Sequence, residues 1–212
     1  MDITRYRATF RKKVIPDYYR GKYHILIFTV LELSSLLICG LFMQWRWWTP
    51  LVILFSLFQA SVLTYFIHRY LLHKKLPGFG WAFKMHHWHH TFYRPEKMTY
   101  DDLNDVYMLL MPPWLQLVYF LIYLPLATLL LAYFAPVKMI VILPFIFGLI
   151  MWYGTYELVH WLEHIPMENP LMRFRVISWL RRHHMVHHSD LRDKANFGIV
   201  EPSMDYLFRT KY

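Results

Sequence analysis

The histidines of this sequence are grouped in a way that could bind metal. Twelve of the 13 histidines form four clusters, and His24 is the exception. The clusters read His68-Arg-Tyr-Leu-Leu-His73, His86-His87-Trp88-His89-His90, His160-Trp161-Leu162-Glu163-His164 and His183-His184-Met185-Val186-His187-His188. Neutral imidazole is the commonest metal ligand in proteins. The four clusters therefore predict a metal-binding site.

The spacing inside the clusters fits helices. Residues i, i+3 and i+4 share a helix face, so His86, His89 and His90 can point together, and the fourth cluster repeats this spacing. The third cluster has its histidines one turn apart. His68 and His73 differ by five residues, which on an ideal helix is about 140°. We therefore expect these two to reach different metals, unless the helix ends between them.

The number of histidines indicates more than one metal ion. Ten well-placed imidazoles exceed the capacity of one ion, because a catalytic site takes about three protein ligands and keeps open positions. Two neighbouring metals are the economical interpretation. Cys39 is the single cysteine and lies inside an apolar run, so a thiolate cluster is excluded. Imidazole suits Fe, Zn, Cu and Ni, so the residues alone leave the element open.

Four apolar segments must position these clusters. The chain is 57% hydrophobic and 19% aromatic, which is too apolar for an ordinary soluble domain of 212 residues. A bilayer core needs roughly 20 apolar residues as helix. Four stretches reach that length, at 23–43, 48–67, 114–134 and 137–157. Short turns at 44–47 and 135–136 would join them as two hairpins, so we expect an all-α integral membrane protein with four transmembrane helices.

The basic residues predict how the chain is oriented. Of the 23 Lys and Arg residues, 21 lie in residues 1–22, 68–105 and 158–212. The positive-inside rule then places both termini and the long loop in the cytosol. We expect a single membrane-embedded domain over 1–212, with a basic interfacial segment at 1–22 and a cytosolic helical cap that carries the histidines. Orientation accounts for the net charge of +9, and we expect no binding of nucleic acid.

The order of the clusters, H-x(4)-H, H-x(2)-HH, H-x(3)-H, H-x(2)-HH, resembles the fatty acid hydroxylase and sterol desaturase superfamily of membrane di-iron oxidoreductases. The tail Asn196-Phe197-Gly198, followed by Pro202, Asp205 and Leu207-Phe208, looks like its C-terminal signature. The match covers roughly 65–210. This resemblance implies ten metal ligands: His68, His73, His86, His89, His90, His160, His164, His184, His187 and His188. His183 remains an alternative to His184, and His87 is a variable position.

The resemblance also implies the reaction. The family is described as using two irons, dioxygen as co-substrate and two external electrons to oxidise an unactivated C–H bond of a lipid taken from the bilayer. Zinc can replace iron in purified protein, because the same imidazoles suit both. We recognise no fused haem-binding domain, so we expect a separate electron-transfer protein, whether of cytochrome b type, a ferredoxin or a reductase. The membrane would be the bacterial cytoplasmic membrane or the endoplasmic reticulum.

Carboxylates near the clusters could orient the ligands. A metal-bound histidine normally donates its other ring N–H to a carboxylate or carbonyl, and Glu157 lies one helical turn before His160. The alternative for Glu157 is a solvated carboxylate at a helix end. Weaker candidates of the same kind are Asp190, Asp193, Glu163 and Asn196. Glu32 falls in the middle of the first span, where we expect a hydrogen bond inside the bundle.

Several functions share this pattern. We expect an oxygen-dependent hydroxylase of fatty acyl or related lipids, and the step Met111-Pro112-Pro113 looks closest to fatty acid 2-hydroxylases. A sterol or lipid desaturase and a carotenoid hydroxylase carry the same histidine pattern and stay open as alternatives. A metal transporter or sensor would need polar spans, whereas these spans offer Glu32 and a few Ser and Thr. A structural protein without metal would leave the spacing of the histidines unexplained.

Overall fold

The structure, a computed structural model, describes residues 2–134, 139–189 and 195–212, and its elements in these ranges are helices. The α-helices are α1 (Ile3–Val14), α2 (Gly21–Phe42), α3 (Thr49–Phe66), α4 (Gly80–Phe92), α5 (Pro113–Val118), α6 (Leu124–Phe134), α7 (Met139–Glu163), α8 (Arg175–His187) and α9 (Ser203–Leu207). Two π-helices, η1 (Ile67–Leu72) and η3 (Tyr119–Tyr123), and two 3-10 helices, η2 (Leu103–Met108) and η4 (Pro170–Arg173), complete them. The all-α prediction is confirmed.

Four helical segments are long and apolar enough to cross a membrane: Gly21–Phe42, Thr49–Leu72, Pro113–Leu130 and Ile140–Glu163. They match the four predicted spans to within a few residues, except that the second and fourth continue further along the chain. His68 and His160 therefore lie inside the long helices and not beyond their ends as expected. The predicted turn at 135–136, and the predicted start of the fourth span at 137, lie outside the described residues.

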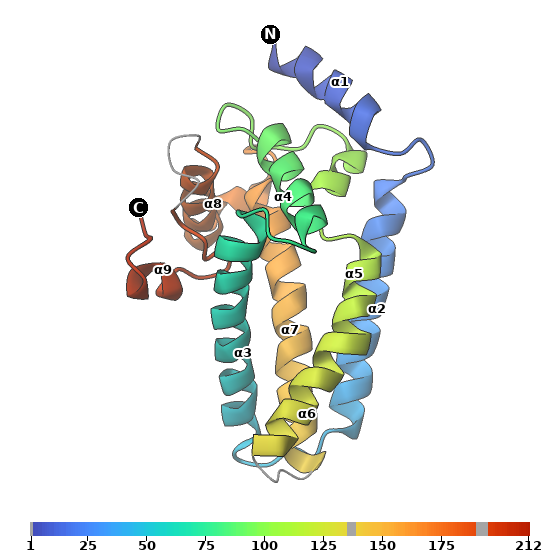
Figure 1. Ribbon diagram of the computed structural model, residues 1–212, viewed down its shortest axis with the longest axis vertical. Coiled ribbons are helices and arrows are strands. Elements are labelled where there is room, and N and C mark those ends of the chain that lie inside the picture. Colours follow the sequence, from blue (N-terminus) through green and yellow to red (C-terminus); the bar gives the residue numbers. More distant parts are fainter. Residues whose placement is uncertain (1, 135–138, 190–194) are drawn as a thin grey trace.

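Helix α7 is the central helix of the bundle. It packs against α3, α2 and α6, and the long helices run side by side in Figure 1. Two glycines of α7 allow this close approach, because a Cβ on Gly148 would collide with Ser56 of α3 and one on Gly154 with Glu32 of α2. The Glu32 carboxylate is buried and accepts a hydrogen bond from Gln116 Nε2 at 3.3 Å. The expected bond inside the bundle is thus confirmed.

The helices outside the four long segments gather at one end of the bundle. There α3 and α7 end and α2 and α5 begin, and α1, α4 and α8 lie over this end (Figure 1). Helix α1 is held to it by apolar contacts, in which Phe10 and Val14 pack on a buried cluster that includes Phe92 and Met108. All four histidine clusters are consequently brought to the same end of the molecule.

Candidate metal centre

Five imidazoles form a first group. Their ligand atoms all lie within 4.8 Å of one another, and the members are His68, His73, His86, His90 and His187. The Nε2 atom of His73 is 2.9 Å from that of His86 and 3.1 Å from that of His187. His86 Nε2 is in turn 3.1 Å from His68 Nε2 and 3.0 Å from His90 Nε2. Histidines that are up to 119 positions apart in the sequence thus converge on one point.

The winding of the chain explains why His68 and His73 share this group. At Ile67 the long helix changes from α to π geometry, and it ends at Leu72 with His73 as its C-cap. A π-helix closes its hydrogen bonds between residues five apart, so such residues come to lie near each other. Their Nε2 atoms are 3.3 Å apart. The helix therefore ends between His68 and His73, which is the alternative that the sequence left open, and the two rings join the same group rather than different ones.

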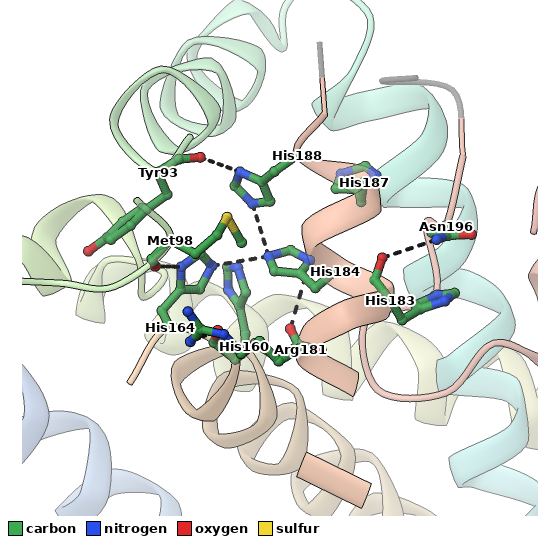
Figure 2. Close-up of polar contacts among 12 residues, drawn as sticks. Tyr93, Met98, His160, His164, Arg181, His183, His184, His187, His188 and Asn196 are labelled. Carbon is green, nitrogen blue, oxygen red and sulfur yellow. Dashed lines mark hydrogen bonds and ion pairs between the residues drawn. The ribbon is translucent and has the colours of Figure 1, made fainter. Parts of the chain in front are cut away.

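A second group forms beside the first. His89, His164, His184 and His188 have ligand atoms within 4.8 Å of one another, and His160 places its Nε2 atom 3.2 Å from that of His89. In Figure 2, His164 and His188 both point at His184, and the Nε2 separations are 3.1 and 3.0 Å. The two groups touch, since the ring of His90 stacks on that of His188 with centroids 4.2 Å apart.

The cap helices α4 and α8 contribute to both groups in a reciprocal way. Helix α4 gives His86 and His90, which are four residues apart, to the first group and His89 to the second. Helix α8 gives His184 and His188 to the second group and His187 to the first. Positions i and i+4 are more closely aligned on a helix than either is with i+3. The three histidines of each helix were expected to point together, but they divide between neighbouring groups.

The donor atoms fit metal ions. His89 Nδ1 is 2.9 Å from the Met108 carbonyl oxygen, and His188 Nδ1 is 2.5 Å from that of Tyr93. A carbonyl can only accept, so each Nδ1 carries the hydrogen, and each neutral ring keeps a bare Nε2. These two Nε2 atoms nevertheless lie 2.9 Å apart. Two lone pairs facing each other at this distance repel, and a metal ion ligated by both nitrogens would remove the repulsion, so the donor atoms fit a metal.

Burial keeps the imidazoles in the state that metals need. Desolvation lowers the pKa of His89 to about 4, and desolvation together with the nearby His187 ring lowers the pKa of His73 to about 2. The pKa values of His184 and His188 are likewise far below the ordinary value, first because both rings are buried. At pH 7 these rings are therefore neutral and free to donate lone pairs to a metal.

Backbone carbonyls fix the tautomers of five of these histidines, in both groups. In the second group, the carbonyls of Tyr93, Met98 and Met108 accept from His188, His164 and His89. In the first group, those of Ala195 and Phe197 accept from His187 and His68, each at 2.7 Å. Carbonyls in this position orient a metal-binding ring and set which nitrogen faces the metal. Two segments, 92–108 and 195–198, therefore supply the outer contacts of the two groups.

Asp205 holds the segment 195–198 in place. Its fully buried carboxylate accepts hydrogen bonds from the N–H groups of Phe197 at 2.9 Å and Gly198 at 2.7 Å, and from the Thr210 hydroxyl at 2.7 Å. Asn196 between these carbonyls adopts φ +54 and donates to the His183 carbonyl at 3.0 Å. The sequence had singled out Asp205 only as part of a family signature and gave no sign of this role.

Replacing Asp205 by Ala should weaken metal binding at the first group. The two carbonyls facing His187 and His68 lose their support, and such outer contacts are typically worth 10- to 100-fold in metal affinity. A chelator titration of the purified protein should show one ion released about 10- to 100-fold more easily and the other unchanged. Asp17→Ala removes an exposed carboxylate and serves as the control. If both ions were bound equally more weakly, the assignment of Asp205 to the first group would be contradicted.

The structure places the other candidate site residues from the sequence as follows. Glu157 forms no hydrogen bond with His160 in the described residues; its Oε2 accepts from the Met111 N–H at 3.1 Å, and its Oε1 has no partner there. Glu163 comes nearer, with Oε2 3.8 Å from His184 Nδ1. His183 points its Nε2 at Asp205 Oδ2, 3.5 Å away, so it is His184 that joins a group. His87 is exposed. Asp190 and Asp193 lie outside the described residues.

A large apolar cavity adjoins the histidines. Its volume is about 570 Å³, and it extends between the ends of α3, α5 and α7. His68, His86, His89 and His160 line one end of it, and most of its remaining wall is aliphatic and aromatic. Both histidine groups therefore contribute rings to the wall of a space that is suited to an apolar ligand.

Comparison with known proteins agrees with this arrangement. The sequence profile of the fatty acid hydroxylase family matches residues 51–210. A solved structure described as full-length scs7p, of which only the hydroxylase domain is visible, superposes with a TM-score of 0.60 at 22% sequence identity. The match covers 88% of this chain and 64% of that one, and at this identity it shows a shared fold. Comparison with curated protein sequences gives no match.

Proposed function

The chain belongs to the fatty acid hydroxylase family, whose members are oxidoreductases. From this premise we propose that it hydroxylates an unactivated C–H bond of a lipid acyl chain. The observation that carries the proposal is the pair of histidine groups, with bare Nε2 atoms facing one another, in the wall of an apolar cavity. The first group would hold one iron and the second, with His160, the other. Bound iron would supply activation of dioxygen with electrons from outside the chain.

The chain itself would position the lipid and exclude water. A cavity of about 570 Å³ lies within the range of small-molecule sites, and its apolar wall favours a hydrocarbon chain over solvent. Because the cavity lies between helices apolar enough to cross a membrane, a lipid could enter it from the bilayer. The four rings at its end would then face the segment of the chain that is oxidised.

Two residues that line this cavity carry polar atoms that would bind a polar group of the lipid. The Tyr153 hydroxyl and Glu157 Oε1 are buried, and neither has a hydrogen-bond partner in the described part of the chain. They lie four residues apart on α7 and so share a face, with His160 a further turn along. A buried polar atom without a partner is costly, so a lipid group that binds there gains affinity.

Replacing Glu157 by Gln should therefore affect the lipid more than the metal. The amide oxygen can still accept from the Met111 N–H, but an NH₂ group then replaces the second carboxylate oxygen. This exchange should change the free energy of lipid binding by about 1 kcal/mol, or roughly fivefold in affinity. We expect unchanged metal content and a shift of that size in the KM for the lipid. A loss of metal would instead favour the role first predicted for Glu157, the orientation of His160.

Lipid analysis of one host with and without the protein tests the proposed reaction. A hydroxylase adds a hydroxylated lipid, a desaturase adds a double bond, and a metal transporter leaves the lipids unchanged while altering cellular metal. The His188→Ala variant is the matched control because it keeps the spans. Absence of any lipid product in a host that supplies iron and a reductant would contradict the proposal.

We also propose the orientation and the partner given by the sequence. Both termini and the histidine end of the bundle would face the cytosol, following the distribution of Lys and Arg. A separate electron-transfer protein would then deliver electrons from that side. Protease access to a C-terminal tag in sealed, right-side-out membranes checks the orientation, since the tag should be protected until the membranes are opened.

A further inference from the structure

Helix α1 lies outside the residues matched by the family profile, 51–210, yet it contacts the segment 92–108 that supplies carbonyls to the second group. The helix lies over the end of the bundle that also carries α4 (Figure 1), and its Arg7 side chain is fully buried. The guanidinium donates to the Phe92 carbonyl at 3.2 Å, to the Thr99 carbonyl at 2.8 Å and to the Lys97 carbonyl. Within the described residues, the hydrogen bonds of this buried cation go to backbone carbonyls of residues 92–99 and to Asp101.

The carbonyls bound by Arg7 are chain neighbours of those that orient histidines. Phe92 is followed by Tyr93, whose carbonyl accepts from His188 Nδ1 at 2.5 Å. Lys97 and Thr99 flank Met98, whose carbonyl accepts from His164 Nδ1 at 2.5 Å. Because successive peptide units are rigid planes, fixing one carbonyl restricts its neighbour. Arg7 therefore constrains the two carbonyls that set the orientation of His188 and His164.

Arg11, one turn further along α1, constrains a third carbonyl. It forms a two-pronged ion pair with Asp105, with N–O distances of 2.6 and 2.7 Å. Asp105 also accepts from the N–H groups of Asp101 and Asp102, which fixes the start of η2. Helix η2 ends at Met108, whose carbonyl accepts from His89 Nδ1 at 2.9 Å. Arg7 and Arg11 together thus brace the loop and the start of η2, in the segment 92–108 that carries the three carbonyls that accept from the second group.

The first group depends on different contacts. Its carbonyls belong to Ala195 and Phe197, and these are held by Asp205 near the C-terminal end of the chain. No hydrogen bond or ion pair within the described residues joins α1 to that segment. The two groups accordingly have separate outer supports at opposite ends of the sequence.

We propose that helix α1, through the guanidinium groups of Arg7 and Arg11, is a positioning element of the second histidine group and not of the first. This rests on the proposed two-metal centre. It predicts that loss of Arg7 makes one ion weakly bound and leaves the other in place. It also means that α1, which precedes the family-matched region, contributes to metal binding.

Metal content of the purified full chain, measured per chain against increasing chelator, tests the proposal. Wild type should release two ions at similar chelator concentrations. Arg7→Ala should release one ion at about 10- to 100-fold lower chelator, the usual effect of losing an outer contact. Arg7→Lys should resemble Arg7→Ala, because a lysine keeps the charge but lacks the planar fork that serves three carbonyls at once. Arg5→Ala, an exposed arginine of the same helix, should behave as wild type.

Combination with ligand variants identifies which ion is lost. In a His73→Ala background the remaining ion is in the second group, so adding Arg7→Ala should release it. In a His164→Ala background the remaining ion is in the first group, so adding Arg7→Ala should change nothing. This pattern of coupling distinguishes positioning from general destabilisation. Arg11→Gln, at a less buried site, repeats the test if Arg7→Ala does not fold.

The outcomes separate the inference from the proposed function. If wild type binds no metal, the proposed centre is wrong and the inference with it. If wild type binds two ions and Arg7→Ala holds both as tightly, or loses both equally, the positioning role alone is overturned. If Arg7→Lys restores binding, charge and not the carbonyl contacts is what matters, and the proposed mechanism is again overturned.

Discussion

Replacing either His73 or His164 by Ala should abolish lipid oxidation and remove one of the two metal ions. His73 Nε2 lies 2.9 Å from His86 Nε2 in the first group, and His164 Nε2 lies 3.1 Å from His184 Nε2 in the second. Loss of an outer contact already costs 10- to 100-fold, so loss of a ligand should cost at least about 100-fold in turnover. Elemental analysis and a lipid assay on the same preparation measure both effects.

The two variants should differ in which ion they lose, so a double variant should lose both. His87→Ala is the matched control, because His87 belongs to the second histidine cluster of the sequence but is exposed and outside both groups. It should keep two ions per chain and full turnover. If His73→Ala retained two ions, the assignment of His73 as a ligand in the first group would be contradicted. Full turnover with only one ion bound would contradict the claim that both ions are needed.

Narrowing the cavity should stop the reaction without affecting the metals. Val118 lines the cavity at the end of α5 and is 39% exposed, so a larger side chain can be accommodated there without forcing the core apart. The indole of Val118→Trp would occupy space that the acyl chain needs. We expect two ions per chain and a fall in turnover of about 10-fold or more, since a site that is overfilled rejects its ligand.

Leu121→Trp provides the control for this variant. Leu121 lies three residues further along the same segment, is 73% exposed and does not line the cavity. The variant should keep wild-type turnover. An effect of equal size in both variants would mean that the bulky side chain acts through the membrane or the fold, and an absence of any effect in Val118→Trp would mean that the lipid binds elsewhere.

The membrane spans were predictable because apolar length alone decides them. All four were found from sequence, and Glu32 was correctly assigned to a hydrogen bond inside the bundle. The helices of the second and fourth spans continue beyond the apolar runs, through the buried rings of His68 and His160. Histidine counts as polar in any hydropathy argument, so the apolar run ends before the helix does.

Which histidine joins which group could not be read from spacing. Helical periodicity correctly predicts that histidines four apart point together, as His86 and His90 do. It does not predict the change to π winding at Ile67, which brings His73 beside His68, and it does not tell one group from the other when both lie next to the same helix. The assignment depends on how α4 and α8 cross, which is a tertiary property.

The outer contacts were the least predictable part of the centre. Glu157 was chosen because a carboxylate one turn from a ligand is a common partner, but it bonds to the Met111 N–H instead. The partners found are mainly backbone carbonyls, which every residue possesses and no sequence pattern marks. The residues that hold those carbonyls, Asp205 and Arg7, are distant in sequence from the histidines they serve.

Transfer of oxygen from isotopically labelled dioxygen to a lipid is the measurement that tests the central claim most directly. Membranes containing the iron-loaded protein and a reductant should form a lipid hydroxyl group that carries the label, and membranes with the His188→Ala variant should form none. Label-free lipids in the presence of two bound ions per chain would contradict the account, because the metals would then serve some purpose other than oxidation of a lipid.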